Sequence, residues 1–366
     1  MTNPLVQLGR LGQSPWYDFI TRDLVRSGQL GRLIAEDGLL GMTSNPSIFE
    51  KAVASSSDYD EEIRQLAGEG LDPKAIFETI AIADVRAACD LFLPTYRATG
   101  GRDGLVSLEV SPALAHNTSA TIAEAQRLWR SLDRPNAMIK IPGTLAGLPA
   151  VTDCIAAGIN VNVTLLFSTN RYRQVIEAYL EGLEARDSRG LPLTGIASVA
   201  SFFVSRVDTR IDPMLDQSGD PHGLRGTIAI ANAAVAYLAF QSSLATSRWA
   251  TLAANGAAPQ RPLWASTSTK DPRYPDVYYV EALIARDTVN TLPPETFTAY
   301  RDHGKPVVRI DHAIATAAER LDRLAGTGID LAAITEFLEQ DGVTKFAAAF
   351  DSLLAGIDAK ASVLTR

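Results

Sequence analysis

The chain has few cysteines and histidines, and this scarcity argues against several classes of protein. Two cysteines, Cys89 and Cys154, are present among 366 residues. They are too few for a disulfide framework or a zinc site. The four histidines are scattered, and none has metal-ligand spacing with an acid on the same predicted strand. We therefore expect neither a metal nor a cofactor, and a metal-dependent isomerase is a weak alternative.

The chain also lacks long runs of apolar or basic residues. No apolar run reaches the ~20 residues that a membrane helix needs. The first residues show no charged leader followed by an apolar core, so we expect no signal peptide and a cytoplasmic location. The net charge is −8 and no long basic run occurs, which argues against nucleic acid as the main ligand. A small anionic substrate is compatible with this charge, because a few local cations can hold it.

The composition that is present predicts a globular α/β protein with a substantial core. Hydrophobic residues make up 46% and charged residues 21% of the chain. Short strand-like stretches alternate with helical ones about eight times, which favours a parallel sheet backed by helices. An open doubly wound sheet usually has a Gly-rich phosphate loop after its first strand, and none is found. We predict a (β/α)8 TIM barrel with extra helices, as a single domain over 1–366 with an insertion around 212–262 and a helical C-terminal tail.

The N-terminal region is the least regular part of this pattern. Residues 5–11 alternate apolar and small side chains and are expected to form the first strand. Ser14 and Pro15 then predict the start of a helix, which would place Asp18 in its first turn. An acid at that place complements the helix dipole. The other strands are expected at 39–46, 106–110, 136–144, 159–165, 196–203, 263–267 and 287–291.

The expected strand at 136–144 contains the sequence Ile139-Lys140-Ile141 and ends at Pro142-Gly143. Side chains alternate between the two faces of a strand, so Lys140 points away from both isoleucines. If helices cover the isoleucine face, Lys140 points into the barrel. Partial desolvation of an amine lowers its pKa and frees it to attack a carbonyl carbon. The alternative is an edge-strand lysine that prevents aggregation.

Other expected strands place polar side chains on the same interior face. Burying so many polar groups is costly unless each is hydrogen-bonded. Polar groups at the C-terminal end of a barrel usually form the active site. This pattern makes Lys140 a candidate nucleophile. The interior set is Glu109, Lys140, Asn162, Thr164 and Ser201, with Asn45 and Asp18 at strand ends or just beyond.

These residue types provide the groups that Schiff-base chemistry on a ketone requires. Lys140 could form the imine, and Glu109 with Thr164 could hold the water that takes part in losing the carbinolamine hydroxyl. Asp18 could take a hydroxyl proton as a carbon–carbon bond breaks. A second group of side chains could hold a phosphate, with arginine binding it bidentately and lysine acting as a point charge. This second group is Arg206, which follows the sixth expected strand, and Ser266 and Lys270, at and after the seventh.

Four sequence motifs together resemble the successive motifs of the transaldolase family. They are Met-Thr-Ser-Asn-Pro-Ser at 42–47, Ser-Leu-Glu-Val at 107–110, Ile-Lys-Ile-Pro-Gly-Thr at 139–144 and Asn-Val-Thr-Leu-Leu-Phe-Ser at 162–168. They occur in family order, and the resemblance extends from Asp18 to Asn290. It implies a class I aldolase-type barrel of the pentose phosphate pathway. The implied reaction transfers a dihydroxyacetone unit from sedoheptulose 7-phosphate to glyceraldehyde 3-phosphate, giving erythrose 4-phosphate and fructose 6-phosphate.

The resemblance also implies a role for each candidate residue. Lys140 would form the Schiff base, Asp18 would be the acid/base in cleavage, and Glu109 with Thr164 would handle the catalytic water. The remaining residues would bind substrate: Asn45, Asn162 and Ser201 the hydroxyls of the three-carbon unit, and Arg206 with Ser266 the phosphate. The chain has Ser-Thr-Ser-Thr-Lys at 266–270 where better-known members have Ser-Phe-Arg. Either Lys270 replaces that arginine or Arg206 acts alone.

One further position bears on the choice between transfer and simple cleavage. Phe203 is expected on the inward face with Ser201 and offers no hydroxyl to protonate an enamine. The related fructose 6-phosphate aldolases carry tyrosine and glutamine where this chain has Phe203 and Glu109. This difference favours a transaldolase. The alternatives are a fructose 6-phosphate aldolase that releases free dihydroxyacetone and a non-catalytic barrel that binds sugar phosphates, and both a monomer and a homodimer stay open.

Overall fold

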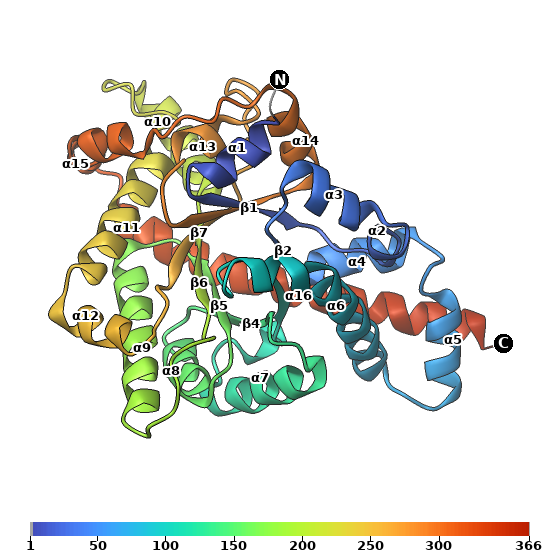
Figure 1. Cartoon of the computed structure of the whole chain (residues 1–366). Coiled ribbons are helices and arrows are strands. Elements are labelled where there is room, and N and C mark those ends of the chain that lie inside the picture. The colour runs from blue at the N-terminus through green and yellow to red at the C-terminus, as the bar shows by residue number, and fades with distance from the viewer. Residues whose placement is uncertain (1–2, 366) are drawn as a thin grey trace.

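The computed structural model describes residues 3–365 (Figure 1). Eight parallel strands form a closed barrel in which each strand pairs with its neighbours in sequence and β8 pairs with β1. Helices surround the barrel, so the predicted (β/α)8 fold is confirmed. The strands are β1 Gln13–Asp18, β2 Gly41–Thr43, β3 Leu105–Glu109, β4 Ala137–Pro142, β5 Val161–Leu166, β6 Ser198–Phe203, β7 Arg261–Ala265 and β8 Thr288–Leu292.

The helices lie mostly between consecutive strands, and several strands are followed by more than one. Those before β3 are α1 Pro4–Arg10, α2 Arg22–Arg26, α3 Gln29–Asp37, α4 Pro46–Ser55, α5 Asp60–Gly68 and α6 Pro73–Ala98. From β3 to β7 they are the short 3₁₀ helix η1 Pro112–Leu114, α7 Thr118–Leu132, α8 Gly147–Ala157, α9 Thr169–Asp187, α10 Ser205–Ser218, α11 Ile228–Leu244 and α12 Ser247–Ala254. The last are α13 Tyr278–Ala282, α14 Pro294–His303, α15 Ile310–Gly326 and α16 Leu331–Leu364.

The N-terminal assignment from sequence is wrong in two places. The stretch expected as the first strand is helix α1, where the Asn3 side chain caps the helix and Leu5 and Leu8 face the core. The stretch expected to start a helix at Ser14 is strand β1, which pairs with both β2 and β8. Tertiary pairing here overrides the local Ser-Pro signal for a helix start. As a result, Asp18 lies at the C-terminal end of a barrel strand and not in the first turn of a helix.

The expected strand at 39–46 is also shorter than predicted. Only Gly41–Thr43 is strand, because Asn45 caps a new helix, α4, and Pro46 occupies its first position. After β6, helix α10 likewise begins at Ser205, with Val204 alone between the strand and the helix. Both helices begin at the C-terminal end of the barrel. Each therefore places side chains close to the residues on the strand ends.

The chain ends in one long helix, α16, as the prediction of a helical C-terminal tail implies. Figure 1 shows α16 running across the molecule, and it packs against α4, α5, α6, α10 and β5. Phe346, Phe350 and Leu353 on its inner face are buried. Gly342 permits the close approach, since a Cβ added there would lie 3.0 Å from Leu165 Cδ2 on β5. The tail therefore covers part of the barrel.

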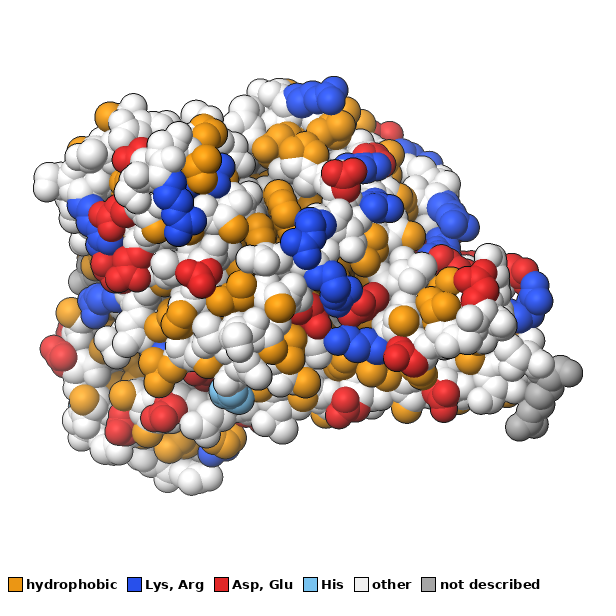
Figure 2. Space-filling model, turned by 90° about the horizontal axis from the view of Figure 1, so that it is seen from below, with side chains coloured by type: hydrophobic (Ala, Val, Ile, Leu, Met, Phe, Trp, Pro, Cys, Tyr) orange, Lys and Arg blue, Asp and Glu red, His pale blue; other side chains and the backbone are white. Residues whose placement is uncertain are grey.

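Two surface properties complete the description. Figure 2 shows a face on which acidic and basic side chains are interspersed and do not form one basic surface. No single helix within 3–365 has both the length and the apolar composition to cross a membrane. Helices α11 and α12, bent by 67° to each other, would meet both criteria only as a pair.

Candidate active site

A pocket of about 630 Å³ opens at the C-terminal end of the barrel. This is the end at which the residues following each strand converge in (β/α)8 barrels. Nine of the eleven candidate residues line it: Asp18, Asn45, Lys140, Thr164, Ser201, Phe203, Arg206, Ser266 and Lys270. The other two lie behind its wall, where Glu109 contacts Lys140 and Asn162 contacts Ser201. The structure therefore brings the whole candidate set together.

Lys140 lines the pocket from β4, and its side chain is almost fully buried. Its Nζ is 3.4 Å from Glu109 Oε2 and donates a hydrogen bond to the backbone oxygen of Ser44 at 3.2 Å. The ring of Phe346 lies on another side, with its centroid 5.8 Å from Nζ. The alternative of an edge-strand lysine is wrong, because a closed barrel has no edge strand.

Glu109 is a buried carboxylic acid beside this amine. Glu109 and Lys140 are register partners on β3 and β4. Burial raises the pKa of Glu109 to about 7, even though the positive charge of Lys140 acts in the opposite direction. Neither carboxylate oxygen of Glu109, nor the hydroxyl of Thr164, has a hydrogen-bond partner among the described residues. Buried polar groups of this kind are usually satisfied by ordered water.

Asn162 is held in one orientation by two hydrogen bonds. Its Nδ2 donates to Ser107 Oγ at 3.0 Å, and Ser201 Oγ donates to its Oδ1 at 2.7 Å. The Ser107–Asn162–Ser201 chain joins β3, β5 and β6 across the barrel interior. Ser107 was not among the candidate residues, although its position on the same face as Glu109 was visible in the alternation of that strand.

Asp18 lies at the C-terminal end of β1, and Asn45 follows β2. The hydroxyl of Thr43 donates to Asp18 Oδ1 at 2.7 Å and orients the carboxylate. Asn45 Oδ1 accepts a hydrogen bond from the backbone N–H of Ile48 at 3.1 Å, as a helix cap. The cap uses the side-chain oxygen of Asn45, so its amide NH2 group is the part that can donate to a substrate.

Arg206, the second residue of α10, is the cation that best suits an anionic ligand. Its guanidinium lies over the ring of Phe203, with Cζ 5.0 Å from the ring centroid. Its Nη1 is buried and has no hydrogen-bond partner within 3–365. Burial lowers the pKa of Arg206, while the charges of Asp341 and Asp18 raise it. A partly buried cation whose buried Nη1 has no partner among the described residues favours an anion at this place.

The loop after β7 supplies further polar groups near Arg206. Ser266 Oγ lies 3.1 Å from Ser205 Oγ, at the start of α10. Lys270 Nζ donates to Ser268 Oγ at 2.6 Å. Both Ser268 and Lys270 line the pocket. A cation therefore is present in this loop, two residues beyond the place where better-known members of the resembled family have arginine.

Several pocket residues were missed by reasoning from sequence. Lys51 comes from α4, and Lys345 and Phe346 come from α16. Lys345 Nζ also pairs with Asp341 Oδ2 at 2.6 Å, one turn earlier on the same helix. No local pattern marks these residues, because the packing of α4 brings Lys51 to the pocket and the docking of α16 against the barrel brings Lys345 and Phe346 there. Within 3–365, no group of three or more His, Cys, Asp or Glu side chains could hold a metal ion.

Comparison with known proteins agrees with this geometry. The family model described as Transaldolase/Fructose-6-phosphate aldolase matches residues 15–357. The chain is 49% identical over 361 residues to a transaldolase of Acidothermus cellulolyticus, covering 98% of this chain and 96% of that protein. It is 48% identical to a transaldolase of Frankia alni (98% and 97% covered) and 46% identical to transaldolase 2 of a Nostoc species (99% and 99% covered). With the barrel and the buried lysine already established, these matches show that the chain belongs to the transaldolase/fructose-6-phosphate aldolase family.

Proposed function

We propose that this chain, as a transaldolase, transfers a dihydroxyacetone unit between phosphorylated sugars through a Schiff base on Lys140. The donor is sedoheptulose 7-phosphate and the acceptor is glyceraldehyde 3-phosphate, a reaction of the pentose phosphate pathway. The observation that carries the proposal is the buried Lys140 amine, 3.4 Å from the Glu109 carboxylate, in a pocket that Arg206 also lines. An amine, a proton-exchanging acid and an anion-binding cation in one pocket suit a phosphorylated ketone.

Imine formation is the first step. Lys140 Nζ attacks the ketose C2, and the carbinolamine then loses its hydroxyl as water. With a pKa near 7, Glu109 can both give and take a proton at neutral pH. The hydroxyl of Thr164, which has no hydrogen-bond partner within 3–365, would orient the water that carries this proton. The two residues together would manage the entry and loss of water.

Carbon–carbon cleavage is the second step. Asp18 takes the proton of the C4 hydroxyl, the C3–C4 bond breaks, and the aldose leaves while the three-carbon enamine stays on Lys140. The hydrogen bond from Thr43 occupies Asp18 Oδ1 and leaves the other oxygen for this proton. Ser201, oriented by Asn162, and the amide of Asn45 would bind hydroxyls of the three-carbon unit. Addition of the enamine to the acceptor aldehyde repeats these steps in reverse.

The phosphate of the sugar would bind to Arg206 with Ser266, Lys270 and Lys345 nearby. We expect Arg206→Ala to weaken phosphorylated substrates selectively, because it removes a charge-assisted contact. The loss in kcat/KM for fructose 6-phosphate should correspond to about 2–3 kcal/mol, on the order of a hundredfold. Free fructose, measured in parallel, should lose little. Equal losses for the two sugars would show that Arg206 does not bind the phosphate.

Transfer must be distinguished from release of free dihydroxyacetone. Phe203 supports transfer, because its ring lines the pocket without a proton donor and packs on Phe167 with centroids 5.2 Å apart. We expect fructose 6-phosphate to be turned over with erythrose 4-phosphate as acceptor, and at least about a hundredfold more slowly without it. Free dihydroxyacetone formed at the rate of transfer would identify an aldolase. Neither turnover nor a covalent adduct would indicate a binding protein.

A further inference from the structure

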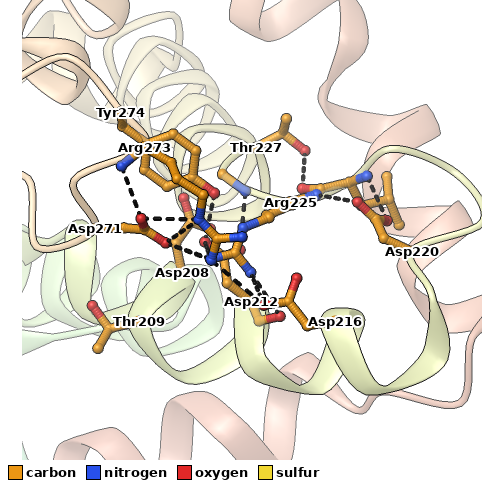
Figure 3. A network of polar contacts seen from close by, with 12 residues as sticks. Asp208, Thr209, Asp212, Asp216, Asp220, Arg225, Thr227, Asp271, Arg273 and Tyr274 are labelled. Carbon is orange, nitrogen blue, oxygen red and sulfur yellow. Dashed lines mark hydrogen bonds and ion pairs between the residues drawn. The ribbon is translucent and has the colours of Figure 1, made fainter.

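A polar network, drawn in Figure 3, involves elements that also contribute to the proposed phosphate end of the pocket. It joins helix α10, the turn at 220–227 that leads into α11, and the loop after β7. Two of these three segments also line the pocket, α10 through Arg206 and the loop through Ser266, Ser268 and Lys270. The network therefore connects the two elements that would hold the phosphate.

Helix α10 presents different faces to the pocket and to the network. Arg206 and Thr209, three residues apart, line the pocket. Asp208, Asp212 and Asp216 are spaced four residues apart, which places them along another face of the helix. Figure 3 shows these three carboxylates on the side of α10 that faces Arg225. Both faces belong to one helix, so a displacement of the face with the three aspartates would also move Arg206.

Arg225 connects this face of α10 to the loop after β7. Its Nη1 donates to the backbone oxygen of Asp212 at 3.1 Å and to Asp216 Oδ2 at 2.5 Å. Its Nη2 pairs with the carboxylate of Asp271, next to Lys270. Tyr274 adds a second link, because its hydroxyl donates to Asp212 Oδ2 at 2.8 Å. One guanidinium and one phenol thus hold the loop against the helix.

The turn that carries Arg225 is itself tightly held. Asp212 Oδ1 accepts from the backbone N–H of Gly226 at 2.9 Å, and Asp208 Oδ1 accepts from that of Ala229 at 2.7 Å. Gly226 has φ +71°, and a Cβ there would lie 2.6 Å from the Tyr274 ring. The turn and the loop are therefore in close contact, with little freedom for Arg225 to reach other partners.

The loop is also held at its beginning. The backbone N–H of Ser205 donates to the backbone oxygen of Ser266 at 3.0 Å. The loop is thus anchored to α10 at Ser266 by Ser205 and at Asp271 by Arg225. Ser268 and Lys270 lie between these two anchors. A phosphate that contacts Arg206 and this loop together requires a fixed distance between them, since small misplacements of binding groups cost much affinity.

We propose that Arg225, with Asp271 and Tyr274, is a positioning residue that sets the spacing between Arg206 and the 266–270 segment. It thereby determines the preference for phosphorylated over unphosphorylated ketones. None of these three residues lines the pocket, so their effect on substrate passes through Arg206 and the loop. The inference rests on the proposed function and assigns a role to part of the expected 212–262 insertion.

The test compares two ketones that form the Schiff base on Lys140, of which the longer, fructose 6-phosphate, carries a phosphate and dihydroxyacetone does not. The full-length Arg225→Met protein is trapped with borohydride at increasing fructose 6-phosphate or dihydroxyacetone, and the adduct is measured by mass. We expect the half-saturating fructose 6-phosphate concentration to rise about tenfold. That for dihydroxyacetone, which has no phosphate, should stay within about twofold, because the Lys140 end of the pocket is unchanged. Arg225→Lys, which retains a cation, should recover part of the loss.

Arg248→Met is the matched control, because Arg248 also pairs with two carboxylates, Glu177 and Glu184, away from the pocket. It should leave both ketones unaffected. Equal weakening of the two ketones by Arg225→Met, or no weakening, would overturn the inference. If Arg225→Met does not fold, the same two half-saturating concentrations are measured for Tyr274→Phe, which removes only the hydroxyl. A rise for fructose 6-phosphate alone would then support the inference. No adduct with the unmodified protein would instead overturn the proposed function, and this inference with it.

Discussion

Replacing Lys140 with methionine is expected to abolish both turnover and borohydride trapping while the barrel stays folded. Methionine fills nearly the same buried volume without an amine, and without that amine no imine can form. Loss of a covalent nucleophile should lower kcat by about 10⁴-fold or more. The fold should survive because Glu109, whose pKa is raised to about 7, can take up a proton once its cation is gone. The measurements are the fructose 6-phosphate transfer rate, the mass of the trapped protein, and the circular dichroism spectrum.

Lys51→Met is the matched control for this experiment. Lys51 lines the same pocket but is exposed, so its loss should leave the adduct intact. Peptide mapping of the unmodified protein should locate the adduct on Lys140. An adduct on another lysine, or turnover by Lys140→Met, would contradict the mechanism.

Glu109→Gln is expected to have the second largest effect, a fall in kcat of about 10²- to 10⁴-fold. The amide fills the same space but cannot exchange a proton with the carbinolamine or its water. The unmodified protein should also lose kcat/KM as the pH falls below about 7, where the Glu109 carboxylate becomes protonated. The Glu109→Gln variant should not show this loss of kcat/KM at low pH. If the variant still loses kcat/KM below about pH 7, another group causes the loss.

The raised pKa of Glu109 also makes the free energy of unfolding depend on pH. Between its ordinary value of 4.5 and about 7, Glu109 holds a proton in the folded protein that the unfolded chain has released. The contribution of Glu109 to the free energy of unfolding is therefore full below pH 4.5 and is lost as the pH rises towards 7. Glu109→Gln should reduce this part of the pH dependence in denaturant titrations. Such a cost at a catalytic group is the usual exchange of stability for function.

Reasoning from sequence failed at the N-terminus for an identifiable reason. Ser14 and Pro15 form a good helix start, and residues 5–11 alternate as a strand does. Residues 13–18 form a strand because they pair with β8, which is far away in sequence, and this pairing closes the barrel. Barrel closure depends on residues far apart in sequence, so the residues near Asp18 alone do not predict it. Asp18 reached its place at the strand end through this pairing.

The residues of the site divide in the same way. Glu109, Lys140 and Asn162 could be predicted because strand alternation alone decides which face each side chain takes. Their register places Lys140 beside both of the others. Lys345 and Phe346 could not be predicted, since they reach the pocket only when a helix near the C-terminus docks across the barrel. The contacts of Arg225 with α10 and with the loop after β7 are equally invisible in sequence.

The sequence by itself determined the alternation of strands and helices and the inward face of each strand. It also contains four motifs that together indicate the family. These features are local, because side-chain alternation and turn chemistry act over a few residues. Only the tertiary structure decided how deeply Lys140 is buried, how far burial raises the pKa of Glu109, and which side chains surround Arg206. Those properties depend on desolvation and on charges brought together from distant segments. Their magnitudes exist only after the chain has packed.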